Sequence, residues 1–368
     1  MGSRFDTVEC WLALARAPAL HADHLRPHPQ LLADPTQLLG QTAGQLQRLG
    51  LPTKAAQWLA APRPDVLEHD RRWLERHSVQ LLHFGGPGFP PLLSHIAAAP
   101  LVLFVRGCAE QLQRPQLAVV GSRQPTPAGR DIAYQFASTL AAAGLVITSG
   151  LAAGIDRIAH EAALQAGHTI AVLGTGPDLT YPPEHHFLID QILAGEGAIV
   201  SEFPRGTTPQ KHNFPRRNRL ISGLALGTLV VEAAERSGSL ITARYANEQG
   251  REVFAIPGSI RNPRANGCNA LIKSGARLVD KPEEILEELN ICNINQLVRH
   301  ISGGRLGHGL LDNDQKILLD ALAFEPASTD QLVERSGFSC QTVTAALLIL
   351  ELEGRVAAQA GGRYVRLT

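Results

Sequence analysis

A short segment of the sequence, KHNFPRRNRLISG at residues 211–223, concentrates positive charge around one aromatic side chain. No acidic residue occurs between Arg205 and Arg219, and Phe214 lies within that stretch. Cations that neutralise phosphates, beside an aromatic ring that stacks on a base, are typical of sequence-tolerant binding to single-stranded nucleic acid. We therefore interpret the segment as a candidate nucleic-acid site, with a solvated basic loop as the alternative. Its cations are Lys211, Arg216, Arg217 and Arg219.

Two glycine turns elsewhere in the sequence could help to hold an anion. The segment VVGSRQPTPAGRDIA predicts a strand, a tight turn at Gly121 and then a helix, and Arg123 follows closely enough to bind a phosphate. The segment VITSGLAAGIDRIAHEAAL repeats this pattern, with Gly150 at the end of its strand. Backbone N–H groups at such turns can bind anions, although a turn that serves only packing has the same sequence. The first turn lacks the dinucleotide and Walker patterns.

Catalytic and metal-binding chemistry have weaker support. Asp156, His160 and Glu161 could exchange protons, but acidic residues at a helix start usually complement the helix dipole. His185 and His186 are adjacent, so on a helix their side chains point about 100° apart and do not share a metal ion without further ligands. We expect no catalytic residue, no metal and no cofactor.

The composition limits the possible partners and the location of the protein. The chain has 368 residues, with 34 Lys and Arg against 34 Asp and Glu, so only a local cluster can attract a polyanion. Its five cysteines are scattered and form no Cys-x-x-Cys pair, which indicates reduced thiols. The N-terminus does not resemble a secretion signal, and no apolar run reaches the roughly 18 residues of a membrane helix. We expect a cytoplasmic protein with no membrane segment.

The elements that must position these residues are short apolar strands separated by helical segments. Continuous apolar runs predict strands buried on both faces, and helical spacers predict parallel pairing. We expect an α/β fold with an extended Rossmann-like, doubly wound and mostly parallel sheet, whose ligands bind at the carboxyl ends of the strands. Arg261, Arg264, Lys273 and Arg277 should add a third wall to one basic rim. The predicted strands lie within 117–122, 145–150, 169–176, 197–203, 228–233 and 252–258.

Smaller modules flank this core. Residues 1–85 predict a small helical module similar to sterile-alpha-motif or helix-hairpin-helix domains, and the core spans 100–290. Residues 291–310 predict a linker, and 311–368 predict three helices and two strands of a winged-helix-like domain. From Asp312 onward eight acidic residues outnumber five basic ones, which disfavours contact with phosphates. We expect this domain to bind protein or to regulate.

The central region resembles the DprA/Smf family, the DNA-processing proteins of natural transformation. The resemblance covers about residues 100–280 in register. It implies a non-catalytic protein that binds and protects incoming single-stranded DNA, helps to load RecA and acts as a homodimer through the core. The matching motifs are VVGSR, SGLAAGIDRIAHEAAL, VLGTGPDLTYPPEH, SEFP, FPRRNRLISGL, VVEAAERSGSLITARYANEQGREVFAIPG and GCNALIKSGA.

The resemblance also assigns roles to individual residues. The phosphate-contacting arginine of the family falls on Arg123, and its lysine and phenylalanine fall on Lys211 and Phe214. Backbone groups near Gly121, Ser122 and Gly150 should assist. A plausible extension of the DNA track comprises Arg216, Arg217, Asn218 and Arg219.

Two other functions stay open at this point. The fold loosely resembles that of enzymes that cleave the base from a nucleoside monophosphate, for which Glu232 is the candidate carboxylate. A sequence-specific regulator acting through the winged helix is the other alternative. We favour single-strand binding, because the cationic track exceeds what one nucleotide needs.

Overall fold

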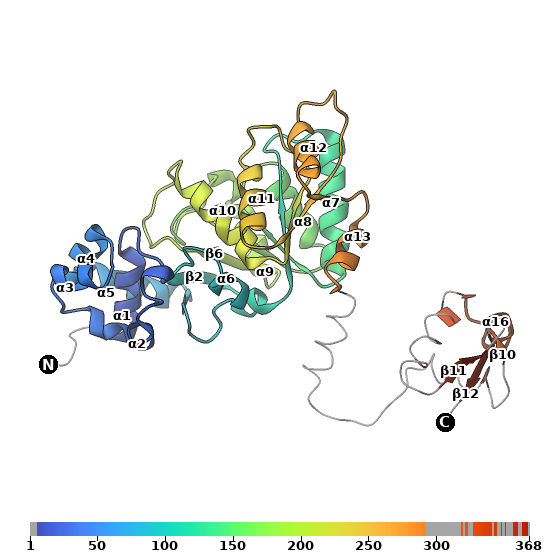
Figure 1. Cartoon of the computed structure of the whole chain (residues 1–368), viewed down its shortest axis with the longest axis horizontal. Helices are drawn as coiled ribbons and strands as arrows, with labels where there is room; N and C mark the ends of the chain where they lie inside the picture. The colour runs from blue at the N-terminus through green and yellow to red at the C-terminus, as the bar shows by residue number, and fades with distance from the viewer. Residues whose placement is uncertain are drawn as a thin grey trace. The chain divides into compact units, whose positions relative to one another are not determined.

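The structure is a computed structural model that forms two compact units, Met1–Gln296 and Leu297–Thr368. Each unit is considered by itself. Figure 1 labels the elements along the chain. The structure describes residues 6–291, 318, 321–322, 327–340, 342–343, 347, 350, 356–359 and 363–366.

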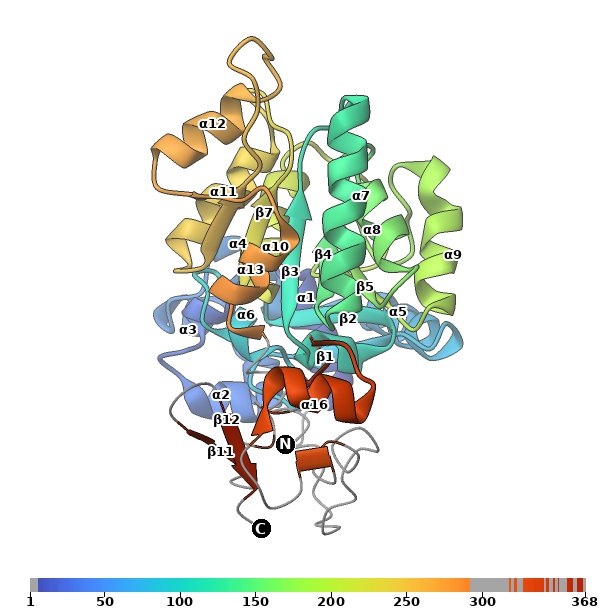
Figure 2. The ribbon, with the colours of Figure 1, turned by 90° about the vertical axis from the view of Figure 1, so that its right-hand side faces the viewer.

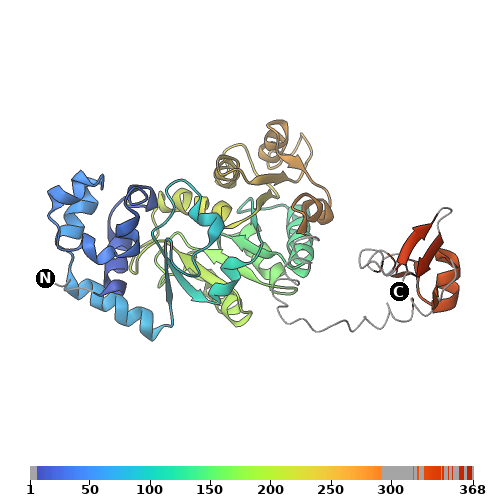
Figure 3. The ribbon, with the colours of Figure 1, turned by 60° about the horizontal axis from the view of Figure 1, so that its bottom comes forward.

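The first unit begins with a cluster of short helices around a leucine-rich core. Asp6 caps the first helix by accepting a hydrogen bond from the N–H of Glu9, whose carboxylate accepts one in return from the N–H of Asp6. Leu12, Leu46 and Leu67 are fully buried between the helices. Figure 3 shows the cluster at the end of the unit where β1 and β2 lie. The helices are α1 (Thr7–Arg16), α2 (Pro29–Ala33), α3 (Ala43–Arg48), α4 (Thr53–Ala60) and α5 (Pro64–Arg76).

A nine-stranded sheet forms the centre of this unit, in the order β1-β2-β6-β5-β4-β3-β7-β8-β9. All six predicted strands are confirmed, and they pair in parallel. β1 and β2, which the sequence did not predict, pair antiparallel with each other, and β2 pairs antiparallel with β6. The strands are β1 (Gln80–His83), β2 (Val102–Gly107), β3 (Gln116–Val120), β4 (Val146–Ser149), β5 (Thr169–Val172), β6 (Ala198–Ser201), β7 (Gly227–Val230), β8 (Glu252–Ala255) and β9 (Arg277–Leu278).

Helices cover both faces of the sheet, so strand residues are apolar in continuous runs. In β3, Leu117 and Val119 pack under α7 and α8, whereas Ala118 and Val120 pack with α10 on the opposite face. Figure 2 shows α7, α8 and α9 side by side. The helices after β1 are α6 (Pro91–Ser94), α7 (Pro127–Ala142), α8 (Ile155–Ala163), α9 (His186–Ala194), α10 (Asn213–Leu224), α11 (Ser239–Glu248), α12 (Asn266–Lys273) and α13 (Pro282–Glu288).

The direction in which successive strands are added to the sheet changes between β3 and β7. From β3 the chain builds β4, β5 and β6 on one side, then returns to β7 on the other side of β3. The loops after β3 and β7 therefore diverge and leave a crevice at the carboxyl ends of these strands. Open α/β sheets bind their ligands at such a point.

The second unit carries the features expected of a winged helix. Ser328 caps α16, as predicted, by accepting a hydrogen bond from the N–H of Gln331, and Gly337, with φ of +71°, ends that helix. A three-stranded sheet in the order β10-β12-β11 completes it. The predicted linker and much of the two other predicted helices lie outside the described residues. The elements are β10 (Ala327–Ser328), α16 (Thr329–Ser336), β11 (Val356–Gln359) and β12 (Arg363–Arg366).

Within the ranges that the structure describes, no helix combines the length and the apolar character that crossing a membrane requires.

Candidate nucleic-acid interface

A cleft of about 770 Å³ opens at the carboxyl ends of β3 and β7. Five segments line it: the turn after β3, the loop after β4 with the start of α8, the loop after β5, the start of α10 and the segment that leads into α11. The fold thus brings together segments spread over residues 120–242 of the sequence. The predicted residues that line the cleft are Gly121, Ser122, Arg123, Lys211, Phe214, Arg217 and Asn218.

Two glycines allow the turn after β3 to pack tightly. A Cβ atom on Gly121 would lie 2.7 Å from Cγ1 of Ile155. Gly154 has φ of +81°, and a Cβ there would lie 2.3 Å from the carbonyl oxygen of Ser122. The N–H of Ile155 donates a hydrogen bond to that oxygen over 3.1 Å. The turn is therefore fixed against α8, while the side chain of Arg123 is exposed at the cleft.

An aromatic pair lies on the β5 side of the cleft. Phe214 is half-buried, and its ring centroid is 5.4 Å from that of Tyr181, which is 43% exposed. A Cβ on Gly174 would lie 2.9 Å from the Phe214 ring, so the absence of a side chain there gives the ring its place. Lys211 is exposed beside this pair. Tyr181 was not predicted; its signal was an aromatic residue in the loop after the third parallel strand.

Arg217 lines the floor of the cleft, but its side chain is buried and its guanidinium is engaged by backbone carbonyl groups. Its residue is only 4% exposed, and Nη1 donates hydrogen bonds to the carbonyl oxygens of Gly150, over 2.6 Å, and Val172. The arginine therefore ties together the ends of β4 and β5. Burial lowers the pKa of its guanidinium to about 10, although neighbouring Asp156 opposes this shift.

Gly150 does not offer the free N–H group that its sequence suggested. It is buried, does not line the cleft, and donates its N–H to Oδ2 of Asp156 over 3.1 Å. Burial raises the pKa of the Asp156 carboxyl, while the charge of Arg217 acts in the opposite direction. Asp156 therefore holds the turn after β4 through the N–H of Gly150, and Arg217 holds the adjacent strand ends through their carbonyl oxygens.

Arg216 and Arg219 point away from the cleft, toward a buried carboxylate. The side chain of Glu202, at the end of β6, is 2% exposed and forms ion pairs with Arg219 and, over 3.2 Å, with Arg216. Arg216 also lies over the Phe203 ring at 5.2 Å. The continuous cationic track predicted from the sequence is therefore corrected. The physical reason is the helical period of α10, which places residues 214, 217, 218 and 221 at the cleft and residues 216 and 219 on another side.

One further cation completes the cleft. Arg236 lines it, and α11 begins there at Ser239. The first N–H groups of this helix are already engaged, because Ser239 and Leu240 donate to Ser237 and Ile241 donates to the carbonyl oxygen of Gly238. The sequence analysis had not singled out Arg236, and the serines beside it in ERSGSL were the available signal. The lining of the cleft contains four cationic side chains and one carboxylate, that of Asp156. The cations are Arg123, Lys211, Arg217 and Arg236.

The other predicted candidates lie apart from this cleft. Glu232 accepts hydrogen bonds from the N–H and the hydroxyl of Thr126, over 2.9 Å and 2.5 Å, and so fixes the cap of α7. Buried His185 contacts the carbonyl oxygen of Leu151, while His186 is exposed. No group of three or more potential metal ligands occurs in the described part of the chain. The expected third wall is also corrected, because Arg261, Arg264, Lys273 and Arg277 do not line the cleft.

Comparisons with protein families place this geometry in context. A family model described as "DNA recombination-mediator protein A" matches residues 80–290. A second one, described as "DprA winged helix domain", matches residues 310–362. The two matches correspond to the sheet unit and to the capped helix and small sheet of the second unit.

Individual proteins are similar over most or part of the chain. Protein Smf of Escherichia coli is 44% identical over 369 residues, which cover 98% of this chain and 96% of that protein. DNA processing protein DprA of Streptococcus pneumoniae is 47% identical over 201 residues, covering 54% of this chain and 71% of that protein.

Solved structures show the same fold. The crystal structure of DprA from Streptococcus pneumoniae has a TM-score of 0.63 and 35% identity, and covers 77% of this chain and 99% of that chain. A structure of DNA processing protein A from Helicobacter pylori, whose description refers to a single-stranded DNA binding mode, has a TM-score of 0.52 and 30% identity. It covers 57% of this chain and 95% of that chain.

Proposed function

The chain belongs to the DNA recombination-mediator protein A (DprA/Smf) family, and we propose that it binds single-stranded DNA in the cleft at the carboxyl ends of β3 and β7. The observation that carries the proposal is the meeting of Arg123 and Lys211 with a half-buried aromatic ring, Phe214, in one open cleft. The single-stranded DNA binding mode named for the Helicobacter pylori relative supports it. In natural transformation, this activity would protect the incoming strand.

The residues divide the work by chemistry. Arg123 and Lys211 neutralise phosphates at the mouth of the cleft, and Arg236 offers a further cation beside the start of α11. Phe214 and Tyr181 present aromatic faces on which a base can stack. Stacking and phosphate contacts do not distinguish one base from another, so binding is largely independent of sequence and weakens with salt.

A matched pair of lysine variants tests the site. Lys211→Ala removes a cation from the cleft, whereas Lys273→Ala removes an equally exposed cation outside it. We expect Lys211→Ala to weaken binding to an oligothymidylate by about tenfold to a hundredfold, the usual range for one charge-assisted contact. A plot of log affinity against log salt concentration should become shallower by about 0.7, the contribution of one phosphate contact to a single strand.

Fluorescence anisotropy across a salt series measures both quantities. Equal affinities and slopes for the two variants would remove the cleft from consideration as the DNA site. Arg123→Glu gives an independent test, because it reverses a charge on a different loop of the same cleft and should weaken binding further.

We also propose that the protein acts by binding and not by breaking bonds. The carboxylate that a nucleotide-cleaving enzyme would need, Glu232, is engaged by Thr126 and does not line the cleft. Release of free base from nucleoside monophosphates would contradict this proposal.

RecA and a second copy of the chain are the proposed protein partners, with the cytoplasm as the place where they meet. Family membership supports both partners. An exposed apolar patch near edge strand β9 supports self-association, since Ile260 is 88% exposed and Leu278 47% exposed. Leu278→Glu should shift the mass measured by light scattering from dimer to monomer, whereas Val8→Glu, on equally exposed α1, should not. The proposal that RecA is a partner is tested by measuring how fast RecA assembles on protein-coated single-stranded DNA. Assembly should be faster when this protein is present than when it is absent.

A further inference from the structure

The loop that carries Lys211 is held from outside the sheet by the N-terminal helices. This loop joins β6 to α10 and spans residues 202–212. Nη2 of Arg16, in the last turn of α1, donates a hydrogen bond to the carbonyl oxygen of Arg205 over 3.0 Å. The guanidinium of Arg205 in turn lies over the ring of Trp73, in α5, at 5.8 Å. The N-terminal helical module therefore contacts both the backbone and the side chain of Arg205.

Arg16 is itself fixed by a buried carboxylate. Its Nε and Nη2 atoms both bond to Asp70 of α5, the latter over 2.7 Å, and the Asp70 side chain is only 4% exposed. A two-pronged arginine–carboxylate pair fixes the plane of the guanidinium, so the donor that reaches Arg205 has a defined direction. Asp70 and Trp73 are three residues apart in α5 and therefore lie on neighbouring positions of one helix surface.

The sheet unit also holds the first part of this loop. The N–H of Gly206 donates to the Asp178 carboxylate over 2.9 Å, and the carbonyl oxygen of Thr207 accepts a hydrogen bond from the N–H of Gly176 over 2.9 Å. Residues 208–212 are all exposed. The anchored residues 205–207 therefore lie immediately before the exposed segment that presents Lys211.

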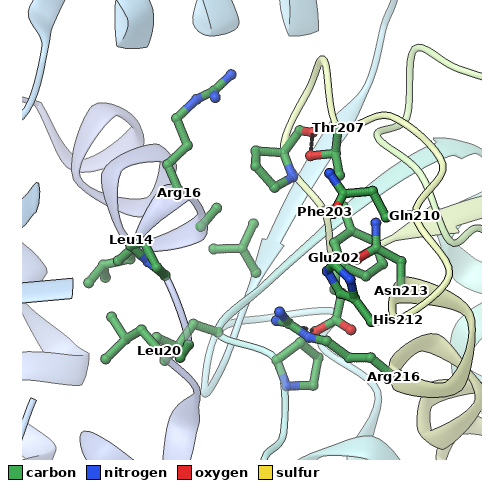
Figure 4. Close-up of a pocket in the computed structure, with 18 residues that line it drawn as sticks. Leu14, Arg16, Leu20, Glu202, Phe203, Thr207, Gln210, His212, Asn213 and Arg216 are labelled. Carbon is green, nitrogen blue, oxygen red and sulfur yellow. Dashed lines mark hydrogen bonds and ion pairs between the residues drawn. The ribbon is translucent and has the colours of Figure 1, made fainter. Parts of the chain in front are cut away.

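Arg16 is separated from the DNA cleft by this loop. It lines a second pocket, of about 450 Å³, between residues 14–20 and the β6–α10 loop. Figure 4 shows Arg16 and Leu14 on one side of that pocket and Gln210, His212 and Arg216 on the other. Arg16 does not line the cleft that holds Lys211 and Phe214. Any influence of Arg16 on the cleft through direct contacts must therefore pass through the loop.

We propose that Arg16 is a positioning residue for single-strand binding, through which the N-terminal helical module fixes the loop that presents Lys211. The proposal rests on the proposed function of the cleft. When a loop occupies its binding-competent conformation only part of the time, the apparent affinity falls by that fraction. The helical module thus acts as a structural part of the DNA site without contacting the strand.

A charge-conserving substitution tests this role. Arg16→Lys keeps the positive charge but loses the planar fork that bonds to Asp70 and Arg205 together. We expect affinity for an oligothymidylate to fall by about threefold to tenfold, as for a loop that is competent one third to one tenth of the time. The matched control is Arg72→Lys on α5. The exposed side chain of Arg72 forms an ion pair with the Glu68 carboxylate, so this substitution should leave the affinity unchanged.

Two further measurements separate positioning from a general loss of structure. Hydrogen exchange of residues 205–211 should quicken in Arg16→Lys while the thermal midpoint stays within about 2 °C of that of Arg72→Lys, because an intact fold keeps its cooperative transition. Asp70→Ala removes a negative charge, so long-range electrostatics alone would strengthen DNA binding. Positioning predicts the opposite sign, since Arg16 then loses its own support.

A double-mutant cycle connects the effect to Lys211. If Arg16 acts through the loop, Arg16→Lys should have little further effect in a Lys211→Ala background. The inference is overturned if Arg16→Lys binds as tightly as Arg72→Lys, or if its effect is fully additive with that of Lys211→Ala. If Lys211→Ala itself leaves binding unchanged, the proposed function of the cleft fails instead, so the two failures are distinguishable.

Discussion

Replacing Arg217 distinguishes a structural arginine from a DNA-contacting one. Arg217→Met keeps most of the aliphatic length of the side chain but removes the guanidinium that bonds to the Gly150 and Val172 carbonyl oxygens. It also leaves Asp156, which is 7% exposed, without its nearest positive charge. The primary consequence should therefore be a loss of stability.

The size of that loss follows from the burial of the pair. Removing one member of a directly bonded buried ion pair typically costs about 3–5 kcal/mol, and this range is an upper bound for Arg217 and Asp156, which are buried neighbours of opposite charge. The lowering of the Arg217 pKa from 12.5 to about 10 corresponds to about 3 kcal/mol against the charged form. Burial thus opposes the charged form more strongly than the Asp156 carboxylate favours it. Removing the second charge as well, in Arg217→Met with Asp156→Asn, should recover about 1–3 kcal/mol relative to the single variant.

Urea unfolding followed by circular dichroism measures these differences. The matched control is Arg216→Met, because Arg216 belongs to the same helix but its side chain is 43% exposed. We expect the control to cost about 1 kcal/mol or less, because the exposed side chain of Arg216 adds little to the pairing of Glu202, which keeps its partner Arg219. The denaturant slope should be checked for each variant, since a changed slope would indicate partial unfolding of one unit.

One outcome would refute this reasoning. If Arg217→Met unfolds at the same urea concentration as Arg216→Met but binds single-stranded DNA with a reduced salt slope, Arg217 contacts phosphate. The geometry of the strand ends would then not depend on its hydrogen bonds.

Buried His160, two glycines with positive φ and Glu232 give three further predictions. Burial lowers the pKa of His160 from 6.5, its value in the unfolded chain, to about 3 in the folded protein. Between these values only the unfolded state binds the extra proton, so the free energy of unfolding should fall by about 2 kcal/mol from pH 8 to pH 5. The urea midpoint of His160→Gln should not show this fall. Gly154→Ala would place a Cβ 2.3 Å from the carbonyl oxygen of Ser122 and should lower both stability and DNA affinity. Gly250→Ala is the control, because Gly250 has φ of +66° but open space around it. This control should lower only stability, by about 1–2 kcal/mol. Glu232→Gln should lower the thermal midpoint, through the loss of charge-assisted bonds worth about 1–2 kcal/mol, and leave single-strand affinity within twofold; a tenfold loss would assign Glu232 to the site.

The sheet and its ligand-binding edge could be predicted because their signals are local. The central parallel strands are buried on both faces, so their sequences are continuous apolar runs, whereas β8 and β9 toward the other end of the sheet are partly or fully exposed. β1 and β2 escaped prediction because antiparallel strands at one end of the sheet lack the strand–helix alternation used to find the others. The pairing of β2 with β6 is a long-range feature.

The cleft could be predicted in part. Arg123 closely follows the end of β3, and the cluster of Lys211 and Phe214 follows β6 through the 202–212 loop, so the meeting of parallel strand ends at one edge predicts their proximity. Tyr181 and Arg236 also follow strands, β5 and β7, but they do not belong to that cationic and aromatic cluster, so the sequence pattern did not single them out.

The sequence by itself determined that this neutral chain contains a parallel α/β core with cations and an aromatic residue at its ligand-binding edge. Only the tertiary structure decided which of those cations can reach a ligand. Arg217 turns inward to the ends of β4 and β5, Arg219 turns to Glu202, and Lys211 stays exposed. The physical reason is that a helix fixes the relative directions of its side chains, whereas the direction that faces solvent depends on the strands and carboxylates packed against that helix. Those partners come from distant parts of the chain.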